Sequence, residues 1–164
     1  HRQGHVMTSR SELESLDAYF NAMPPAAALS LRAEHFDGVS LRLHAPLAAN
    51  LNDKGCAFGG SLASVMTLAG WGLITLKLQR AGVAAEVYVA DSQIRYIAPL
   101  YDDLRAEASV DDDGDWAVAL HCFRTRGRAR MTLGATMRDA GGALVASLQA
   151  RYAILPVTRP ATEA

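Results

Sequence analysis

Apolar and polar residues alternate with two different periods along this chain, and the period predicts which segments are helices and which are strands. The first segment has the helical period, with Ser9 or Ser11 as its N-cap, and the Pro24-Pro25 pair ends it. Its apolar face consists of Leu13, Leu16 and Phe20. We therefore expect a short amphipathic helix at the start of the chain.

A period of two predicts six strands in three pairs. They cover residues 29–34 and 39–43, 86–97 and 104–110, and 128–138 and 144–152. Asp37-Gly38 and Gly141-Gly142 are typical of the tight turns that join antiparallel strands. The first and last pairs are therefore expected to be hairpins.

A second short helix is predicted between the last two pairs of strands. Asp115 can cap it and Gly127 can end it. The residues with helical spacing are Trp116, Leu120 and Phe123.

The longest apolar segment has no charged residue from position 56 to position 76, and about 20 such residues are enough to span a membrane. Two features argue against a span: glycine, serine and threonine recur along the segment, and half-polar strands flank it on both sides. A helix that is apolar on nearly every side must otherwise be enclosed by protein. We predict such a central helix, with Lys77 and Arg80 near the negative end of its dipole and Gly82 after its last turn.

Charge and cysteine content exclude several classes of protein. The 164 residues include 16 Lys and Arg and 17 Asp and Glu, so no strong field favours nucleic acid or an anionic membrane as a partner. Cys56 and Cys122 lack the paired spacing of a zinc site or a disulfide framework, which indicates reduced thiols and a cytoplasmic protein. Residues 1–6 precede Met7 and look like a tag remnant, and residues 7–164 are expected to form one domain.

The order of these elements predicts an α+β fold. A six-stranded antiparallel sheet can bury the long helix only by curling around it. The other face of the sheet is then left for solvent or for a partner subunit.

Three short motifs resemble the signatures of hotdog-fold thioesterases. The chain is most similar to the thioesterase-like domain that some bacterial proteins fuse to a GNAT-type acetyltransferase. The motifs are Gly55-Cys56-Ala57-Phe58-Gly59-Gly60-Ser61-Leu62, preceded by Asn52-Asp53-Lys54, then Gly70-Trp71-Gly72, and Arg126-Gly127-Arg128-Ala129-Arg130. The resemblance implies a hotdog fold and an acyl thioester as ligand, with CoA or phosphopantetheine as part of the substrate and with no separate cofactor or metal.

One departure from the family limits the mechanism. The resemblance to phenylacetyl-CoA and 4-hydroxybenzoyl-CoA type enzymes implies a His at the position of Phe58 and an Asp or Glu at the position of Thr67. Both groups are missing here, whereas Asn52 and Gly59 match the family pattern. A proton-transferring group is worth about two to four powers of ten in rate, so the general base has to be sought elsewhere, with Asp53 and Asp91 as candidates.

We expect the catalytic groups to be Asn52, Gly59 and Thr67. The Gly59 N–H lies in the first turn of the long helix, where free amides and the positive dipole end suit a thioester oxygen that gains charge. Asn52 can polarise the carbonyl, although an Asn beside Asp53 can equally form a turn. Thr67 can orient a water, or its hydroxyl can bond back to its own helix. Likewise, Gly59-Gly60 can serve only to permit a tight turn.

The remaining predicted contacts are to substrate. The predicted substrate-binding residues are Phe58, Gly60, Ser61, Ser64, Asp91 and Arg95. Arg95 and the late arginines can bind CoA phosphates or an acidic carrier protein, or can simply be solvated. The strand with Ser92-Gln93-Ile94-Arg95-Tyr96 resembles the hotdog strand that pairs with its copy, which implies a homodimer or a tetramer.

Two functions remain open at this point. The first is hydrolysis of acyl-CoA or acyl carrier protein thioesters, and the second is a module that binds the acyl group without turnover. A serine hydrolase is disfavoured because His35, His44 and His121 show no triad spacing with Ser61 or Ser64. A hydratase is disfavoured because no His and carboxylate pair stands at the site.

Overall fold

The computed structural model describes residues 9–110 and 113–158, so the expected tag remnant at residues 1–6 lies outside the described residues. The helices are α1 Ser9–Ala22, α2 Pro24–Ala28, the short 3-10 turn Leu47–Ala49, α3 Gly59–Arg80 and α4 Asp113–Arg126. The strands are β1 Arg32–Phe36, β2 Ser40–Ala45, β3 Glu86–Tyr96, β4 Leu104–Ser109, β5 Ala129–Arg138 and β6 Leu144–Leu155.

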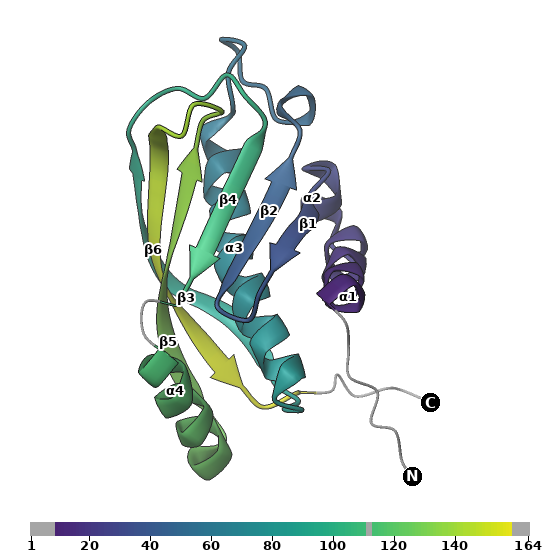
Figure 1. The fold of residues 1–164 in the computed structure, drawn as a ribbon, viewed down its shortest axis with the longest axis vertical. Coiled ribbons are helices and arrows are strands. Elements are labelled where there is room, and N and C mark those ends of the chain that lie inside the picture. The colour runs from purple at the N-terminus through teal and green to yellow at the C-terminus, as the bar shows by residue number, and fades with distance from the viewer. Residues whose placement is uncertain (1–8, 111–112, 159–164) are drawn as a thin grey trace.

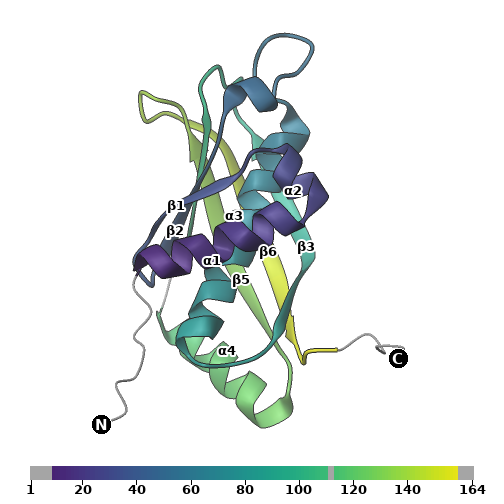
Figure 2. The same cartoon turned by 90° about the vertical axis from the view of Figure 1, so that its right-hand side faces the viewer.

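The six strands form one sheet in the order β1-β2-β4-β5-β6-β3, and every neighbouring pair is antiparallel. The sheet curls along one side of α3, while α1 lies across α3 on the side away from the sheet (Figures 1 and 2). This is the predicted hotdog fold. Because β1 and β3 are the edge strands, the part of α3 next to β3 is where the sheet ends.

Helix α3 is the core of the molecule. It is long and apolar enough to cross a bilayer, but 67% of its most apolar 18-residue window is buried inside the fold. Side chains with no exposed surface include Val65, Met66, Leu73, Ile74 and Leu76. The charge-free segment therefore forms the buried helix that its composition predicts.

Two glycines let α3 come close to its neighbours. A Cβ at Gly72 would lie 2.8 Å from Leu41 of β2 and 3.1 Å from Leu16 of α1, and one at Gly70 would overlap the hydroxyl of Tyr152 on β6. Any larger residue would force the helix away from the sheet and from α1. The Gly70-Trp71-Gly72 motif is thus explained by packing.

Helix α1 ends at Ala22, just before Pro24-Pro25 as predicted, but the pair also begins an unpredicted helix, α2, because proline suits the first helical positions. Two predicted boundaries were wrong. Leu29 is the C-cap of α2, so β1 begins only at Arg32. Helix α4 begins at Asp113, so Asp115 lies in its first turn and is not the cap.

A buried ion pair joins α1 to the end of α3. The carboxylate of Glu12, 1% exposed, accepts hydrogen bonds from Nε and Nη2 of Arg80 at 2.7 and 2.8 Å. The Arg80 side chain is 42% exposed and lies 4.4 Å from the centre of the Phe36 ring. Water can therefore reach the cation but not the anion.

This asymmetry predicts different costs for the two halves of the pair. Arg80→Met would leave the Glu12 carboxylate buried without a partner and should cost about 3 kcal/mol of stability. Glu12→Gln leaves a cation that water can solvate, and should cost only about 1 kcal/mol. Urea unfolding of both variants measures the difference, and equal losses would show that the pair is not asymmetric.

Candidate functional site

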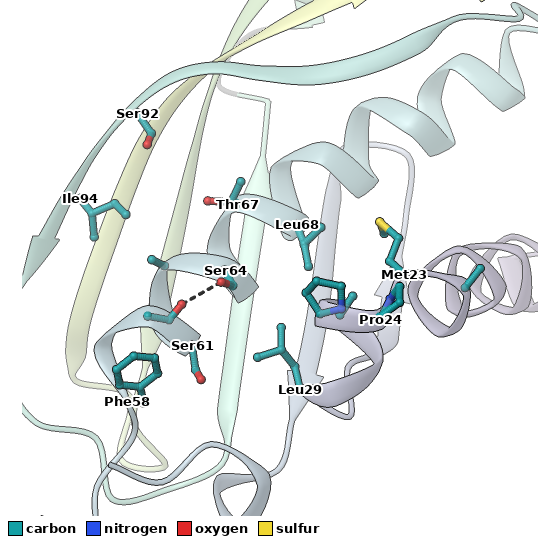
Figure 3. Close-up of a pocket in the computed structure, with 15 residues that line it drawn as sticks. Met23, Pro24, Leu29, Phe58, Ser61, Ser64, Thr67, Leu68, Ser92 and Ile94 are labelled. Carbon is teal, nitrogen blue, oxygen red and sulfur yellow. Dashed lines mark hydrogen bonds between the residues drawn. The ribbon is translucent and has the colours of Figure 1, made fainter. Parts of the chain in front are cut away.

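An open cavity of about 850 Å³ lies beside the first turns of α3, between β3 and α2 (Figure 3). Within the described residues, its wall contains no charged side chain and no histidine. The wall includes five of the predicted site residues: Phe58, Gly60, Ser61, Ser64 and Thr67. The cavity is thus suited to an uncharged, largely apolar group.

The N-terminus of α3 provides hydrogen-bond donors beside this cavity. Phe58 is the N-cap, with an extended backbone at φ −63° and ψ 130°, and its carbonyl accepts from the amides of Ser61 and Leu62 at 2.9 and 3.1 Å. The amides of Gly59 and Gly60 have no acceptor in the part of the chain that the structure describes. These two N–H groups, at the positive end of the helix dipole, are free to bind an oxygen.

The two glycines differ in their surroundings. A Cβ at Gly60 would lie 2.5 Å from the ring of Phe58, which is 55% exposed and covers this turn. A Cβ at Gly59 would lie 3.7 Å from Tyr96 of β3, an ordinary contact. Tyr96 also donates a hydrogen bond from its hydroxyl to the Gly59 carbonyl at 3.3 Å. A side chain at Gly60 would therefore displace the Phe58 ring, whereas one at Gly59 would displace nothing.

The three hydroxyls on this face of α3 behave differently. Ser64 donates back to the carbonyl of Gly60 at 2.8 Å. Ser61, only 4% exposed, and Thr67 have no hydrogen-bond partner among the described residues. The Thr67 hydroxyl points across the cavity toward Ser92 of β3 (Figure 3). The back-bonded alternative considered for Thr67 is wrong, and it is Ser64 whose hydroxyl is occupied.

Asn52 lies outside the cavity wall. Its Oδ1 accepts from the amides of Lys54 and Cys56 at 2.8 and 3.1 Å, and its Nδ2 lies 3.1 Å from Cys56 Sγ. The side chain therefore shapes the loop that leads into α3, in the manner of a turn-forming Asn. Its predicted contact with a substrate carbonyl finds no support in this geometry.

Asp91 and Arg95 lie on the opposite face of the sheet. Side chains on a strand alternate between faces, and Ser92 and Ile94 are the β3 residues in the cavity wall. Arg95 instead lines a hollow on the outer face of the sheet. Asp91 follows a bulge in β3 and pairs with Arg151, its neighbour on β6. Their prediction as residues of this site is not supported, because the strand period separates them from the cavity.

The other candidate bases and histidines are also occupied or distant. Asp53 is exposed in the loop and pairs with Lys54. His44 pairs with Asp103, and the amide of Leu47 and this His44 contact lower the Asp103 pKa. Within the described residues no group of three or more His, Cys, Asp or Glu side chains could hold a metal ion.

Comparison with known proteins identifies the family of this chain. Residues 13–156 match the family YiiD_C, whose description is "Putative thioesterase (yiiD_Cterm)". The chain belongs to this family.

Solved structures agree with the family. The protein OLEI01261 of unknown function from Chlorobaculum tepidum TLS is 31% identical, with a TM-score of 0.88 over 94% of this chain and 100% of that chain. A protein from Shewanella oneidensis, named as a putative thioesterase, is 27% identical, with a TM-score of 0.81 over 90% and 99% of the two chains. The Pseudomonas aeruginosa protein PA5026 is 24% identical and shares the fold, with a TM-score of 0.77 over 93% and 99%.

In this member of the family, Tyr152 holds the part of α3 that carries Thr67. The Tyr152 hydroxyl donates to the Thr67 carbonyl at 2.6 Å and also receives a hydrogen bond from the Trp71 amide. Burial raises the Tyr152 pKa far above its usual range, more than the Trp71 amide lowers it, so the hydroxyl keeps its proton and remains a donor.

Sequence reasoning missed the far wall of the cavity. Met23, Pro24 and Leu29 belong to α2 and its two caps, and they line the cavity opposite α3. Ser92 and Ile94 line it from β3. The alternation of β3 could have indicated the last two, but nothing local to the first three shows that they face the long helix.

The overlap between Gly70 and Tyr152 predicts coupled stabilities. Gly70→Ala should destabilise the protein by about 2 kcal/mol through overpacking, and Tyr152→Phe by about 1 kcal/mol through the lost hydrogen bond. In the double variant the overlapping hydroxyl is gone, so the combined loss should be smaller than the sum. Thermal or urea unfolding of the four proteins measures this coupling, and strict additivity would contradict the contact.

Proposed function

We propose that this protein hydrolyses acyl thioesters carried by CoA or by an acyl carrier protein. The observation that supports this most is the pair of unused amides at Gly59 and Gly60, because Gly60 lines the uncharged cavity and Gly59 precedes it in the first turn of α3. The family and its named relatives support the same reaction class. The substrate carrier and the catalytic residues are part of the proposal.

The amides would act on the thioester oxygen. As water attacks the carbonyl carbon, this oxygen gains negative charge, and preorganised N–H donors stabilise that charge better than they stabilise the ground state. The dipole of the 22-residue helix α3 adds to the effect at its N-terminus. A backbone donor needs no side-chain proton transfer, so the missing histidine at Phe58 does not remove it.

Water would be oriented by Thr67. Its hydroxyl has no partner among the described residues and points into the cavity. The water oxygen bonds to the carbonyl carbon, the carbon–sulfur bond breaks, and the departing thiolate takes up the proton that water releases. Because no side chain of the described wall can act as a base, we expect turnover to be slower than in enzymes with a carboxylate on this helix.

The same observation favours a second candidate, a module that binds acyl groups without turnover. A cavity wall with no base holds an acyl chain as well as one with a base does. Release of free thiol from an acyl thioester separates the two, because a binding module retains the intact thioester.

We also propose a homodimer formed through β3. This strand is an 11-residue edge strand whose residues are all at least partly exposed. An edge of that length presents unpaired backbone groups, and a second copy of β3 is the partner that its antiparallel geometry suits. Such pairing would also cover the cavity side at Ser92 and Ile94. The two free cysteines support placement in the cytoplasm, and the resemblance to acetyltransferase-fused domains stays a prediction.

Gly59 allows a direct test of the backbone donor. Proline is tolerated at the first helical residue, and the extended backbone of Phe58 is compatible with a following proline. Gly59→Pro therefore removes the N–H while keeping the helix, and should lower kcat by about 10²- to 10³-fold. Gly59→Ala keeps the N–H and adds only a Cβ at an ordinary contact distance from Tyr96. It is therefore the matched control, and its kcat should stay within a few-fold of that of the parent.

Assays of free thiol with acyl-CoA substrates measure both variants. Equal rates for Gly59→Pro and the parent would exclude this amide as the oxyanion donor. No thiol release by the parent itself, together with tight acyl binding, would support the binding module instead.

Thr67 is tested by a pair of near-isosteric changes. Thr67→Val removes the hydroxyl at nearly constant shape and should lower kcat about tenfold, the rate equivalent of one hydrogen bond, with KM little changed. Thr67→Ser keeps the hydroxyl and should retain most of the rate. If Thr67→Val keeps the parent rate while Thr67→Ser loses it, the methyl group rather than the hydroxyl is the important part of Thr67.

A further inference from the structure

The cavity has two chemically different ends. Toward β3, the hydroxyls of Thr67 and Ser92 face one another across the opening (Figure 3). Toward α2, the wall consists of apolar side chains, among them Met23, Leu29 and Leu68 (Figure 3). Gly60, in the first turn of α3, also lines the cavity. A ligand with one polar and one apolar arm therefore has a preferred direction.

The apolar end is built on a rigid wall. Pro24 and Pro25 occupy the first positions of α2, where their fixed φ limits backbone motion. Asn50, 3% exposed, donates from Nδ2 to the carbonyl of Leu29 at 3.0 Å and to that of Pro46 at 2.8 Å. The far end of α2 is thereby tied to the segment that leads toward α3. Because α2 is held at both ends, it limits the size of the ligand group that can lie between α2 and α3.

Resting on the proposed thioesterase function, we propose that the acyl tail lies between α2 and α3, and that Met23 determines its length. The pantetheine arm, which carries amide groups, then leaves toward the hydroxyl of Ser92 on β3. The carbonyl at the junction meets the amides of Gly59 and Gly60.

The chemistry of the wall restricts the tail to an uncharged aliphatic chain. A carboxylate or hydroxyl on the tail would lie against Leu29 and Leu68 with no partner, and an unpaired polar group in such surroundings is costly. From Gly60 to Leu68 the helix rises about 12 Å, the extended length of a medium chain such as octanoyl or decanoyl. Met23, half-buried where α1 meets α2, closes this end.

The test varies chain length against the size of residue 23. Met23→Ala deepens the apolar end, and Met23→Trp fills it. Val118→Ala changes a 69% exposed side chain on α4 and serves as the control. Each protein is titrated calorimetrically with thioether analogues of acyl-pantetheine, from butyryl to palmitoyl, since this arm is common to CoA and carrier proteins. The matching thioesters are assayed for thiol release.

We expect the parent and Val118→Ala to bind octanoyl and decanoyl analogues best. Affinity should rise about fourfold per methylene up to that length, the value of one buried methylene. Met23→Ala should move the optimum to longer chains and Met23→Trp to shorter ones. An ω-carboxyl analogue should bind far more weakly than the alkyl analogue of equal length.

An unchanged chain-length profile in both Met23 variants, or equal binding of the ω-carboxyl analogue, would overturn the assignment. Unfolding midpoints identify a Met23 variant that fails to fold. The other Met23 variant then decides whether residue 23 sets the chain length. A shifted binding profile without thiol release would keep the tail site and remove the hydrolase proposal. Thiol release with an unshifted chain-length profile would keep the hydrolase proposal and remove the tail site.

Discussion

The whole structure depends on covering a helix that is apolar on almost every side. Water is a poor environment for α3, so the chain surrounds it with the inner face of a sheet and with α1. The cover is incomplete beside the first turns, where β3 ends the sheet and α2 begins. That uncovered strip carries glycine, serine and threonine, and it is where the cavity lies.

Small residues and hydroxyls therefore have different roles along one helix. Near its middle, Gly70 and Gly72 let Tyr152, Leu41 and Leu16 approach the backbone. Near its beginning, Gly60 makes room for the Phe58 ring instead. The buried Tyr152 hydroxyl also donates a hydrogen bond to the Thr67 carbonyl. This bond connects the packed core to the part of α3 that lines the cavity.

The proposed chemistry of this protein depends on its backbone more than on its side chains. With Phe58 and Thr67 at the positions where the resemblance to phenylacetyl-CoA type enzymes implies a histidine and a carboxylate, this part of α3 has no ionisable side chain in the cavity wall. What remains is the set of donors that every helix N-terminus has, placed beside an apolar cavity. Donors of this kind stabilise charge without changing their protonation state, which distinguishes this site from one that works by proton transfer.

Local sequence determined the elements and the fold class, since helical and strand periods, turn glycines and one uncharged segment all depend on neighbouring residues. It also indicated the amide of Gly59 and the presence of Gly60 at the site. Only the tertiary structure decided which side chains share the cavity: it moved Asp91 and Arg95 to the other face, used Asn52 in a loop, and brought Met23 and Leu29 opposite α3. A site between elements distant in sequence depends on how they pack, and no local period encodes that.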